Sequence, residues 1–199
     1  MNKISIFGAS GHAKVVVEII LLNNLALKNV YDNDFEKIKF LDHDIEHDLE
    51  KIEMNTFVTI GNNRIRKSIV NEYKLEASCL IHPNSVVSIF SKIGLGTVIM
   101  AGVIINPNVL IGNHCIINSN CSIDHDCNIE DFVHVSPGVS IAGNVSIGEC
   151  SHIGIGSCII QGISIGKNCI IGAGSVIIRN IPDNSVVVGN PGKIIKNNL

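Results

Sequence analysis

Residues 111–135 read IGNHCIINSNCSIDHDCNIEDFVHV, and in this stretch Ile or Val returns at every sixth position. The same spacing continues without an exception from Ile81 to Ile177. Four positions after each of these residues stands another small or β-branched residue. A strict six-residue period is typical of a hexapeptide β-helix. It excludes an amphipathic helix, in which apolar residues recur at intervals of three and four.

The repeat also predicts the size and shape of this domain. Three hexapeptides form one triangular coil, so the seventeen repeats predict between five and six coils, and no insertion interrupts them. Residues 81–199 therefore predict a left-handed parallel β-helix, in which Val186–Lys193 supplies a final strand and turn that cover the open end. Bent corner backbone is expected from the Gly or Asp that directly follows many inward residues: Gly94, Gly112, Asp124, Gly148, Gly154, Gly166 and Gly172.

Residues 1–80 lack the six-residue period and read as alternating strands and helices. Lys3–Phe7 predicts a buried strand, which the glycine turn Gly8–Gly11 joins to a helix over His12–Leu22. Further on, the sequence predicts strands at Val30–Tyr31 and Thr56–Ile60 and a helix at Arg64–Tyr73, with a weakly patterned acidic stretch over 33–53. This alternation predicts a small parallel sheet in a Rossmann-like α/β domain, one mononucleotide-sized half of a dinucleotide fold. A full NAD site is not expected, because the complete GxGxxG pattern is missing.

The glycine turn between a strand and a helix is a candidate phosphate site. Backbone N–H groups at the start of the helix after Gly8–Gly11 could hold a phosphate. Asp32, at the tip of the next strand, could accept hydrogen bonds from a ribose or a base. The alternative is a plain tight turn, which the short pattern also fits.

Composition narrows the class of protein further. The net charge of −3 gives no electrostatic case for binding nucleic acid or an anionic membrane. No secretory segment and no apolar run of transmembrane length is found, so a cytoplasmic protein is expected. Seven Cys without a CxxC pair suggest neither a disulfide framework nor a zinc knuckle. Four of them fall at the small inward position and read as buried apolar residues: Cys115, Cys121, Cys127 and Cys169.

One cluster in the β-helix carries side chains suited to catalysis. His125 stands between Asp124 and Asp126 at an outward corner, and a neutral His beside a carboxylate is a general base with raised basicity. A solvated corner His is the structural alternative. A metal site is the chemical alternative, in which His125 and His134 would be joined by His114 or His152. No metal is expected, because the H-x4-H pair of the gamma carbonic anhydrase type is missing. His43 and His47 read as part of a solvated acidic loop.

The chain resembles the hexapeptide sugar acyltransferases that carry an N-terminal nucleotide-binding domain. These include the sialic acid O-acetyltransferase type and the N-acetyltransferases of nucleotide-linked 4-amino-sugars, with closest resemblance to the UDP-4-amino-sugar enzymes of the bacillosamine pathway. The resemblance covers essentially the whole chain. It rests on five motifs: GASGH from Gly8, IGNN from Ile60, IDHDC from Ile123, HVSPG from His134 and VGNPGK from Val188.

The resemblance implies a homotrimer with the acetyl-CoA site between adjacent β-helices. It implies His125 as the catalytic base and Asp126 as its supporting carboxylate, which in the bacillosamine enzymes is usually the longer Glu. The nucleotide-sugar site would contain Ser10, Gly11, His12, Asp32, Gly61, Asn62 and Asn118. The acetyl-CoA groove would contain His134, Gly143, Ile155, Gly156 and Ala173, with the Gly143 N–H as donor to the oxyanion.

We therefore expect acetyl-CoA-dependent N-acetylation of a UDP-linked 4-amino-4,6-dideoxy sugar for glycan biosynthesis. The alternatives are N-acetylation of GDP-linked perosamine and O-acetylation of sialic acid. A non-catalytic β-helix that binds a sugar nucleotide or scaffolds a partner is the alternative from another class.

Overall fold

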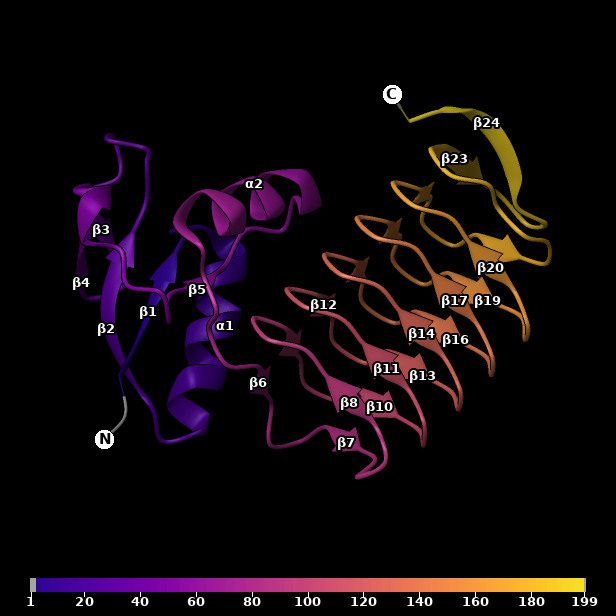
Figure 1. The fold of residues 1–199 in the computed structure, drawn as a ribbon, viewed down its shortest axis with the longest axis horizontal. Helices are drawn as coiled ribbons and strands as arrows, with labels where there is room; N and C mark the ends of the chain where they lie inside the picture. Colours follow the sequence, from indigo (N-terminus) through magenta and orange to yellow (C-terminus); the bar gives the residue numbers. More distant parts are fainter. Residues whose placement is uncertain (1–2, 199) are drawn as a thin grey trace.

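The chain is described over residues 3–198 by a computed structural model, in which an α/β domain precedes a long stack of triangular coils (Figure 1). The sheet of the α/β domain has the order β3-β4-β2-β1-β5, and its pairs are parallel except for β3 with β4. Its elements are β1 (Lys3–Phe7), α1 (Gly11–Leu22), β2 (Ala26–Tyr31), β3 (Lys39–Phe40), β4 (His43–Glu46), a 3-10 helix at Leu49–Lys51, β5 (Phe57–Val58) and α2 (Asn63–Tyr73).

Both helices and the strands β1, β2 and β5 lie where the sequence predicts them, within a few residues. The weakly patterned stretch over 33–53 contains more structure than expected. It forms β3, β4 and the 3-10 helix, because Ile45 pairs with Val30 and adds β4 to the sheet beside β2. Alternating apolar residues are scarce in so short a strand, so its period is weak in the sequence.

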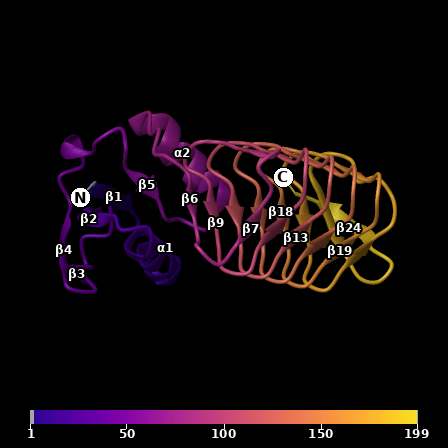
Figure 2. The ribbon, with the colours of Figure 1, turned by 90° about the horizontal axis from the view of Figure 1, so that it is seen from below.

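The β-helix has one two-residue strand in each hexapeptide, and the residue 18 positions later is the parallel partner in the next coil. One sheet contains β6, β9, β12, β15, β18 and β21; the second contains β7, β10, β13, β16, β19 and β22; the third contains β8, β11, β14, β17 and β20. The strands are β6 (Leu80–Ile81), β7 (Val86–Val87), β8 (Lys92–Ile93), β9 (Val98–Ile99), β10 (Ile104–Ile105), β11 (Leu110–Ile111), β12 (Ile116–Ile117), β13 (Ser122–Ile123), β14 (Asn128–Ile129), β15 (His134–Val135), β16 (Ser140–Ile141), β17 (Ser146–Ile147), β18 (His152–Ile153), β19 (Cys158–Ile159), β20 (Ser164–Ile165), β21 (Ile170–Ile171) and β22 (Val176–Ile177). Figure 2 shows the coils stacked along the long axis away from the α/β domain.

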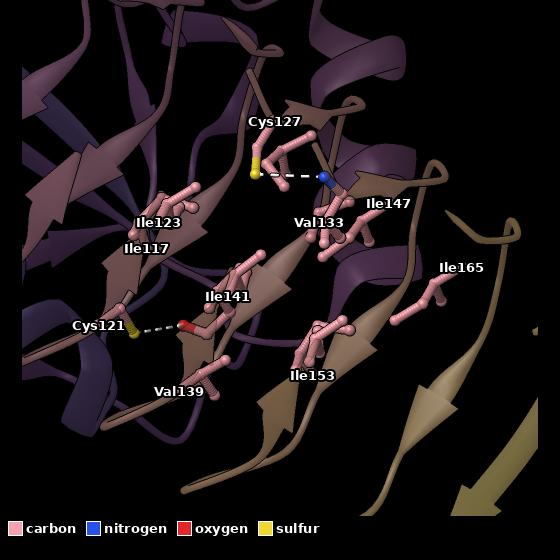
Figure 3. Close-up of a cluster of buried hydrophobic side chains, with 14 of the residues drawn as sticks. Ile117, Cys121, Ile123, Cys127, Val133, Val139, Ile141, Ile147, Ile153 and Ile165 are labelled. Atoms are coloured by element: carbon pink, nitrogen blue, oxygen red, sulfur yellow. Dashed lines mark hydrogen bonds between the residues drawn. The ribbon is translucent and has the colours of Figure 1, made fainter. Parts of the chain in front are cut away.

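The core of the prism consists of the six-residue Ile and Val together with the small residue four positions later (Figure 3). Cys115, Cys121, Cys127 and Cys169 belong to this core, as predicted. Full burial of one such Ile stabilises the fold by about 1.5–3 kcal/mol relative to an exposed side chain. The β-helix predicted from the period is confirmed, and its first strand begins at Leu80.

The corners differ from the expectation in one respect. Every sixth residue from Gly96 to Gly174 has a left-handed backbone, and this residue stands three positions after the inward Ile or Val. The glycines directly after the Ile have ordinary φ values, so their expected role in bending the backbone was wrong. Instead, these glycines allow the backbones of neighbouring coils to lie close together. A Cβ on Gly148 would lie 2.6 Å from the carbonyl carbon of Gly166 in the next coil.

The open end of the prism is covered by two strands where one was predicted. β23 (Ser185–Val188) pairs parallel with β21, and β24 (Lys193–Asn197) then pairs antiparallel with β23. At the other end α1 lies between the sheet of the α/β domain and the first coils (Figure 1), and its buried residues share a core with Val98, Met100 and Ile116. Neither helix in residues 3–198 has the length and apolar character needed to cross a membrane.

Candidate functional site

His125 stands at the corner between β13 and β14, held by the carboxylates on both sides of it. Its Nδ1 lies 2.8 Å from Asp126 Oδ2, and its backbone N–H donates to Asp124 Oδ1 at 2.8 Å. The left-handed backbone of Asp126, with φ 59°, belongs to the regular corner pattern. Because Nδ1 faces the carboxylate, Nε2 is the ring nitrogen left to exchange a proton with a ligand.

Both carboxylates are fixed from the preceding coil. Asn106 Nδ2 donates to Asp124 Oδ1 at 2.7 Å, and Asn108 Nδ2 donates to Asp126 Oδ1 at 3.2 Å. The hydrogen bond with Asp126, and secondarily the charge of Asp124, raise the pKa of His125 above its usual value. The same cluster lowers the pKa of Asp126, first through His125 and then through Asn108. The arrangement suits a general base whose basicity is raised by its carboxylate neighbours.

Gly143 lies under the His125 ring in the following coil. A Cβ at this position would come within 2.8 Å of Cε1 and 2.9 Å of Nε2 of His125, so the ring can occupy its position only because residue 143 is glycine. Within residues 3–198, the Gly143 N–H makes no hydrogen bond. An unused N–H beside a base is suited to bind a developing oxyanion.

The turn Gly8–Gly11 lies at the carboxyl end of β1, beside the turn after β5. Gly8 has φ 110°, and Thr59 Oγ1 lies 2.6 Å from its carbonyl oxygen, so the two turns are joined. Ser10 forms the N-cap of α1 without a side-chain capping bond. Gly11 is exposed, and a Cβ built on it meets nothing within 4 Å. Ser10 and Gly11 are exposed at the start of α1, where the phosphate site is predicted.

Asp32 lies directly after β2, as expected, but its carboxylate is already engaged by the protein. It is buried, accepts the Ala9 N–H at 2.7 Å and the Asp34 N–H at 2.9 Å, and contacts Lys37 Nζ at 3.0 Å. Burial acts to raise its pKa, but these hydrogen bonds outweigh burial and the net shift is downward. Asp32 thus holds the glycine turn in shape, and most of its accepting capacity is already used by the protein.

A group of imidazoles lies between the α/β domain and the β-helix. His134 Nε2 lies 3.3 Å from Asn118 Nδ2, and the His134 and His152 rings are 4.7 Å apart between centroids. The Nε2 of His12 and the Nδ1 of His134 are buried and have no hydrogen-bond partner in residues 3–198. Burial is the main cause that lowers the pKa of His12 to about 4 and that of His134 to about 3, so both rings are neutral.

The predicted site residues fall into two separate groups in one chain. His125, Asp126 and Gly143 lie at corners between the second and third sheets of the prism. Asn118, His134, Ile155, Gly156 and Ala173 lie on the first sheet or at the corner after it, on the side where His12 approaches. The charged groups that shift the pKa of His125 are Asp124 and Asp126 alone, so the imidazole group does not reach it. The two corners of the triangle face different sides of the prism.

Two clefts accompany these groups. One of about 400 Å³ lies where α2 meets the β-helix and is lined by Asn62, Asn63, Arg64, Cys150, His152, Ile170 and Asn198. A cleft of about 460 Å³ follows the outer face of β11 and β14 and contains none of the predicted residues. Asn62 itself caps α2, because its Oδ1 accepts the Ile65 N–H at 3.1 Å. In residues 3–198, no three His, Cys, Asp or Glu side chains are grouped as a metal site would require.

Sequence reasoning missed Arg66, which is buried where the two domains meet and contacts both. One signal was present. Arg66 stands three and four positions before Ile69 and Val70, so it shares the apolar face of the predicted helix. A charged residue on a buried face calls for a specific set of partners.

Residues 3–73 match the family described as the PglD N-terminal domain. A curated relative, the UDP-N-acetylbacillosamine N-acetyltransferase of Bacillus subtilis (strain 168), is 37% identical over 113 residues. That alignment covers 51% of this chain and 52% of the relative, so the chain spans about half the length of this curated protein.

Two solved structures match nearly the whole chain. A point mutant of perosamine N-acetyltransferase from Caulobacter crescentus, in complex with CoA and GDP-perosamine, is 33% identical and superposes with a TM-score of 0.93, covering 99% of this chain and 98% of that one. The acetyltransferase domain of PglB from Neisseria gonorrhoeae FA1090 is also 33% identical, with a TM-score of 0.91 and coverage of 98% and 100%.

Proposed function

The chain belongs to the family of hexapeptide-repeat sugar N-acetyltransferases with a PglD-type N-terminal domain, and from this premise we propose that it transfers an acetyl group from acetyl-CoA to the amino group of a nucleotide-linked sugar. The observation that carries the proposal is His125, held between two anchored carboxylates with Gly143 beneath its ring. A catalytically silent β-helix needs no such arrangement.

In the proposed reaction the sugar amine attacks the carbonyl carbon of the thioester. Nε2 of His125 accepts the proton that the nitrogen loses, and Asp126 stabilises the imidazolium through Nδ1. Negative charge develops on the carbonyl oxygen, where the N–H of Gly143 is available as a donor. When the intermediate collapses, the carbon–sulfur bond breaks and the proton on His125 passes to the departing thiolate. The amide and free CoA are the products.

The α/β domain is proposed to hold the nucleotide. The diphosphate would lie against the N–H groups of Ser10, Gly11 and His12, since this helix start is open and glycine-rich. Asp32 fixes the turn from beneath, and Gly61 and Asn62 border the same edge of the sheet. The sugar would then extend toward Asn118 and His134.

A complete site is proposed to form between two chains of a homotrimer. The His125 corner of one chain would face the side of its neighbour that contains His134, Ile155, Gly156 and Ala173, with the acetyl-CoA groove between them. Ile155 supports this assignment, because its side chain is 56% exposed in the single chain. Cyclic three-fold closure suits a prism of triangular section, since each chain then gives one face and receives another.

UDP is proposed as the nucleotide, on the basis of the Bacillus relative and the PglD-type domain. The second candidate, a GDP-linked sugar, is favoured by the likeness to perosamine N-acetyltransferase, which extends over 99% of this chain.

A thioester-release assay against UDP- and GDP-linked 4-amino-sugars tests the proposal. Release with one of them identifies the nucleotide, and sialic acid in the same panel tests O-acetylation. If folded protein released no CoA with any amino-sugar, the N-acetyltransferase assignment would be wrong.

A further inference from the structure

Arg66 is almost completely buried, with 1% of its side chain surface exposed, and each of its N–H groups has an acceptor. Nε donates to His114 O at 2.8 Å. Nη1 donates to Ile60 O at 2.8 Å and to Gly61 O at 3.2 Å. Nη2 donates to Asn63 Oδ1 at 2.8 Å and to Phe132 O at 3.0 Å. A guanidinium has five donors, and all five are used.

The acceptors come from both domains. Ile60 and Gly61 belong to the turn after β5, whereas His114 and Phe132 belong to the β-helix. Asn63 extends the contact to a third coil, where its Nδ2 donates to Cys150 O and Ser151 O, both at 3.0 Å. His114, Phe132 and Cys150 are 18 residues apart and all have the left-handed corner conformation, so they form one vertical stack.

This stack offers carbonyl groups that the β-helix does not use itself. From coil to coil, the N–H of Phe132 donates to Asn113 O and that of Cys150 donates to Asp131 O. The carbonyls of the left-handed residues remain outside this ladder, and Arg66 and Asn63 bind three of them. The spacing of the coils thus determines where α2 can attach.

Arg66 has no carboxylate among its partners in the described part of the chain. Burial lowers its pKa to about 10, so it is still a cation at neutral pH. A buried cation is a weak source of stability, because desolvation offsets much of what its hydrogen bonds contribute. The five hydrogen bonds of Arg66 have fixed directions, so they allow only one arrangement of the turn after β5 and the β-helix.

We propose that Arg66 is a positioning residue for the nucleotide sugar. By binding Ile60 O and Gly61 O together with two coils of the β-helix, it fixes the turn after β5 over the side of the prism that contains His134 and His152. The nucleotide held by the α/β domain then presents its sugar at a fixed position on the β-helix. This inference rests on the proposed function.

The test compares Arg66→Lys and Arg66→Met with a control in the same interface, Lys67→Met. Lys67 makes an ion pair with Glu149 at 2.6 Å and is partly exposed, so its loss removes a contact between the domains without disturbing the turn. Below the unfolding temperature, both Arg66 variants are expected to raise KM for the sugar nucleotide about tenfold or more and to leave KM for acetyl-CoA within about twofold. Lys67→Met should leave both KM values within about twofold.

Arg66→Lys separates geometry from charge. Lysine retains the positive charge and loses the planar set of donors, so an Arg66→Lys enzyme with normal KM values would overturn the inference. If the Arg66 variants do not fold, Asn63→Ala provides the second test. It removes the bonds to Cys150 O and Ser151 O and one acceptor of Arg66, and it should raise KM for the sugar nucleotide by about threefold or more. An unchanged KM would count against the positioning role.

Amide hydrogen exchange gives a readout that does not depend on the reaction. Faster exchange is expected at the amides of Thr59 and Ile65, which donate to Phe7 O and Asn62 Oδ1 on either side of the turn, in the Arg66→Lys protein and not in Lys67→Met, because only the former frees the turn. Unchanged exchange would overturn the inference even if acetyl transfer is shown. If no amino-sugar is a substrate, the proposed function is wrong. The exchange measurement then still shows whether Arg66 fixes the turn after β5.

Discussion

At the residue scale, the arrangement of His125 predicts how the reaction depends on pH. The hydrogen bond with Asp126 raises the pKa of His125, and only neutral His125 can accept a proton. The value of kcat/KM should therefore fall as pH drops below this pKa. Asp126→Asn keeps the shape and removes the charge, so the acidic limb should move to lower pH and the plateau rate should also fall. A pH–rate profile measures both. An acidic limb that stayed in place or moved to higher pH would contradict this role of Asp126.

Removal of the base itself should have a larger effect. His125→Ala is expected to lower kcat by about 10²-fold or more, because proton transfer loses its acceptor while the exposed corner keeps its backbone bonds. His82→Gln changes a histidine in the first coil, two coils before Asn118 and in neither group of site residues, and serves as the control with kcat within about twofold. Steady-state kinetics with the best amino-sugar substrate distinguishes the two. Near-normal turnover of His125→Ala would remove it from the mechanism.

At the scale of the elements, glycine has different functions at two positions of a corner. Directly after the inward residue it allows close contact with the next coil, and three positions after that residue it adopts the left-handed backbone. Gly148→Ala places a Cβ 2.6 Å from the backbone of Gly166, so it should destabilise the protein by about 1–3 kcal/mol. Gly162→Asn is the matched change. Gly162 has φ 72° with nothing near a Cβ, and Asn108, Asn144 and Asn168 already adopt this conformation, so the cost should stay below about 1 kcal/mol. Denaturant unfolding at equal protein concentration measures both, and equal losses would refute the distinction.

The same elements show what the sequence can predict. The strands of the β-helix could be predicted from the period of six, because each inward Ile or Val marks one strand of a coil. The Asp-His-Asp corner was visible because neighbours in the sequence are also neighbours in space. The hydrogen bonds that Asp32 makes within the protein were not predicted, since its bond to Ala9 joins residues 23 positions apart. Arg66 was missed because its acceptors at His114 and Phe132 are set by how the two domains dock, which no local pattern records.

At the scale of the whole molecule, the separation of the two groups of site residues requires an explanation. His125 and Gly143 occupy one corner of the prism, and the glycine turn with His134 occupies another side. In the proposed assembly, the nucleotide sugar held by one chain reaches the base of its neighbour. We therefore expect active protein to have three times the mass of the single chain by light scattering, and activity confined to a single-chain species would contradict the proposed assembly.

A mixture of two inactive variants provides the sharper test. His125→Ala removes the base from one corner. Gly11→Trp is designed to block the nucleotide turn, at an exposed position where an added Cβ meets nothing within 4 Å. In trimers assembled from equal amounts of both, a site between two chains is intact when one chain supplies His125 and its neighbour supplies Gly11. Random assembly gives this combination at about a quarter of the sites. Doubly tagged mixed trimers exclude the homotrimers and have one such site of three, so they should regain about a third of the wild-type activity, whereas sites built within single chains would regain none.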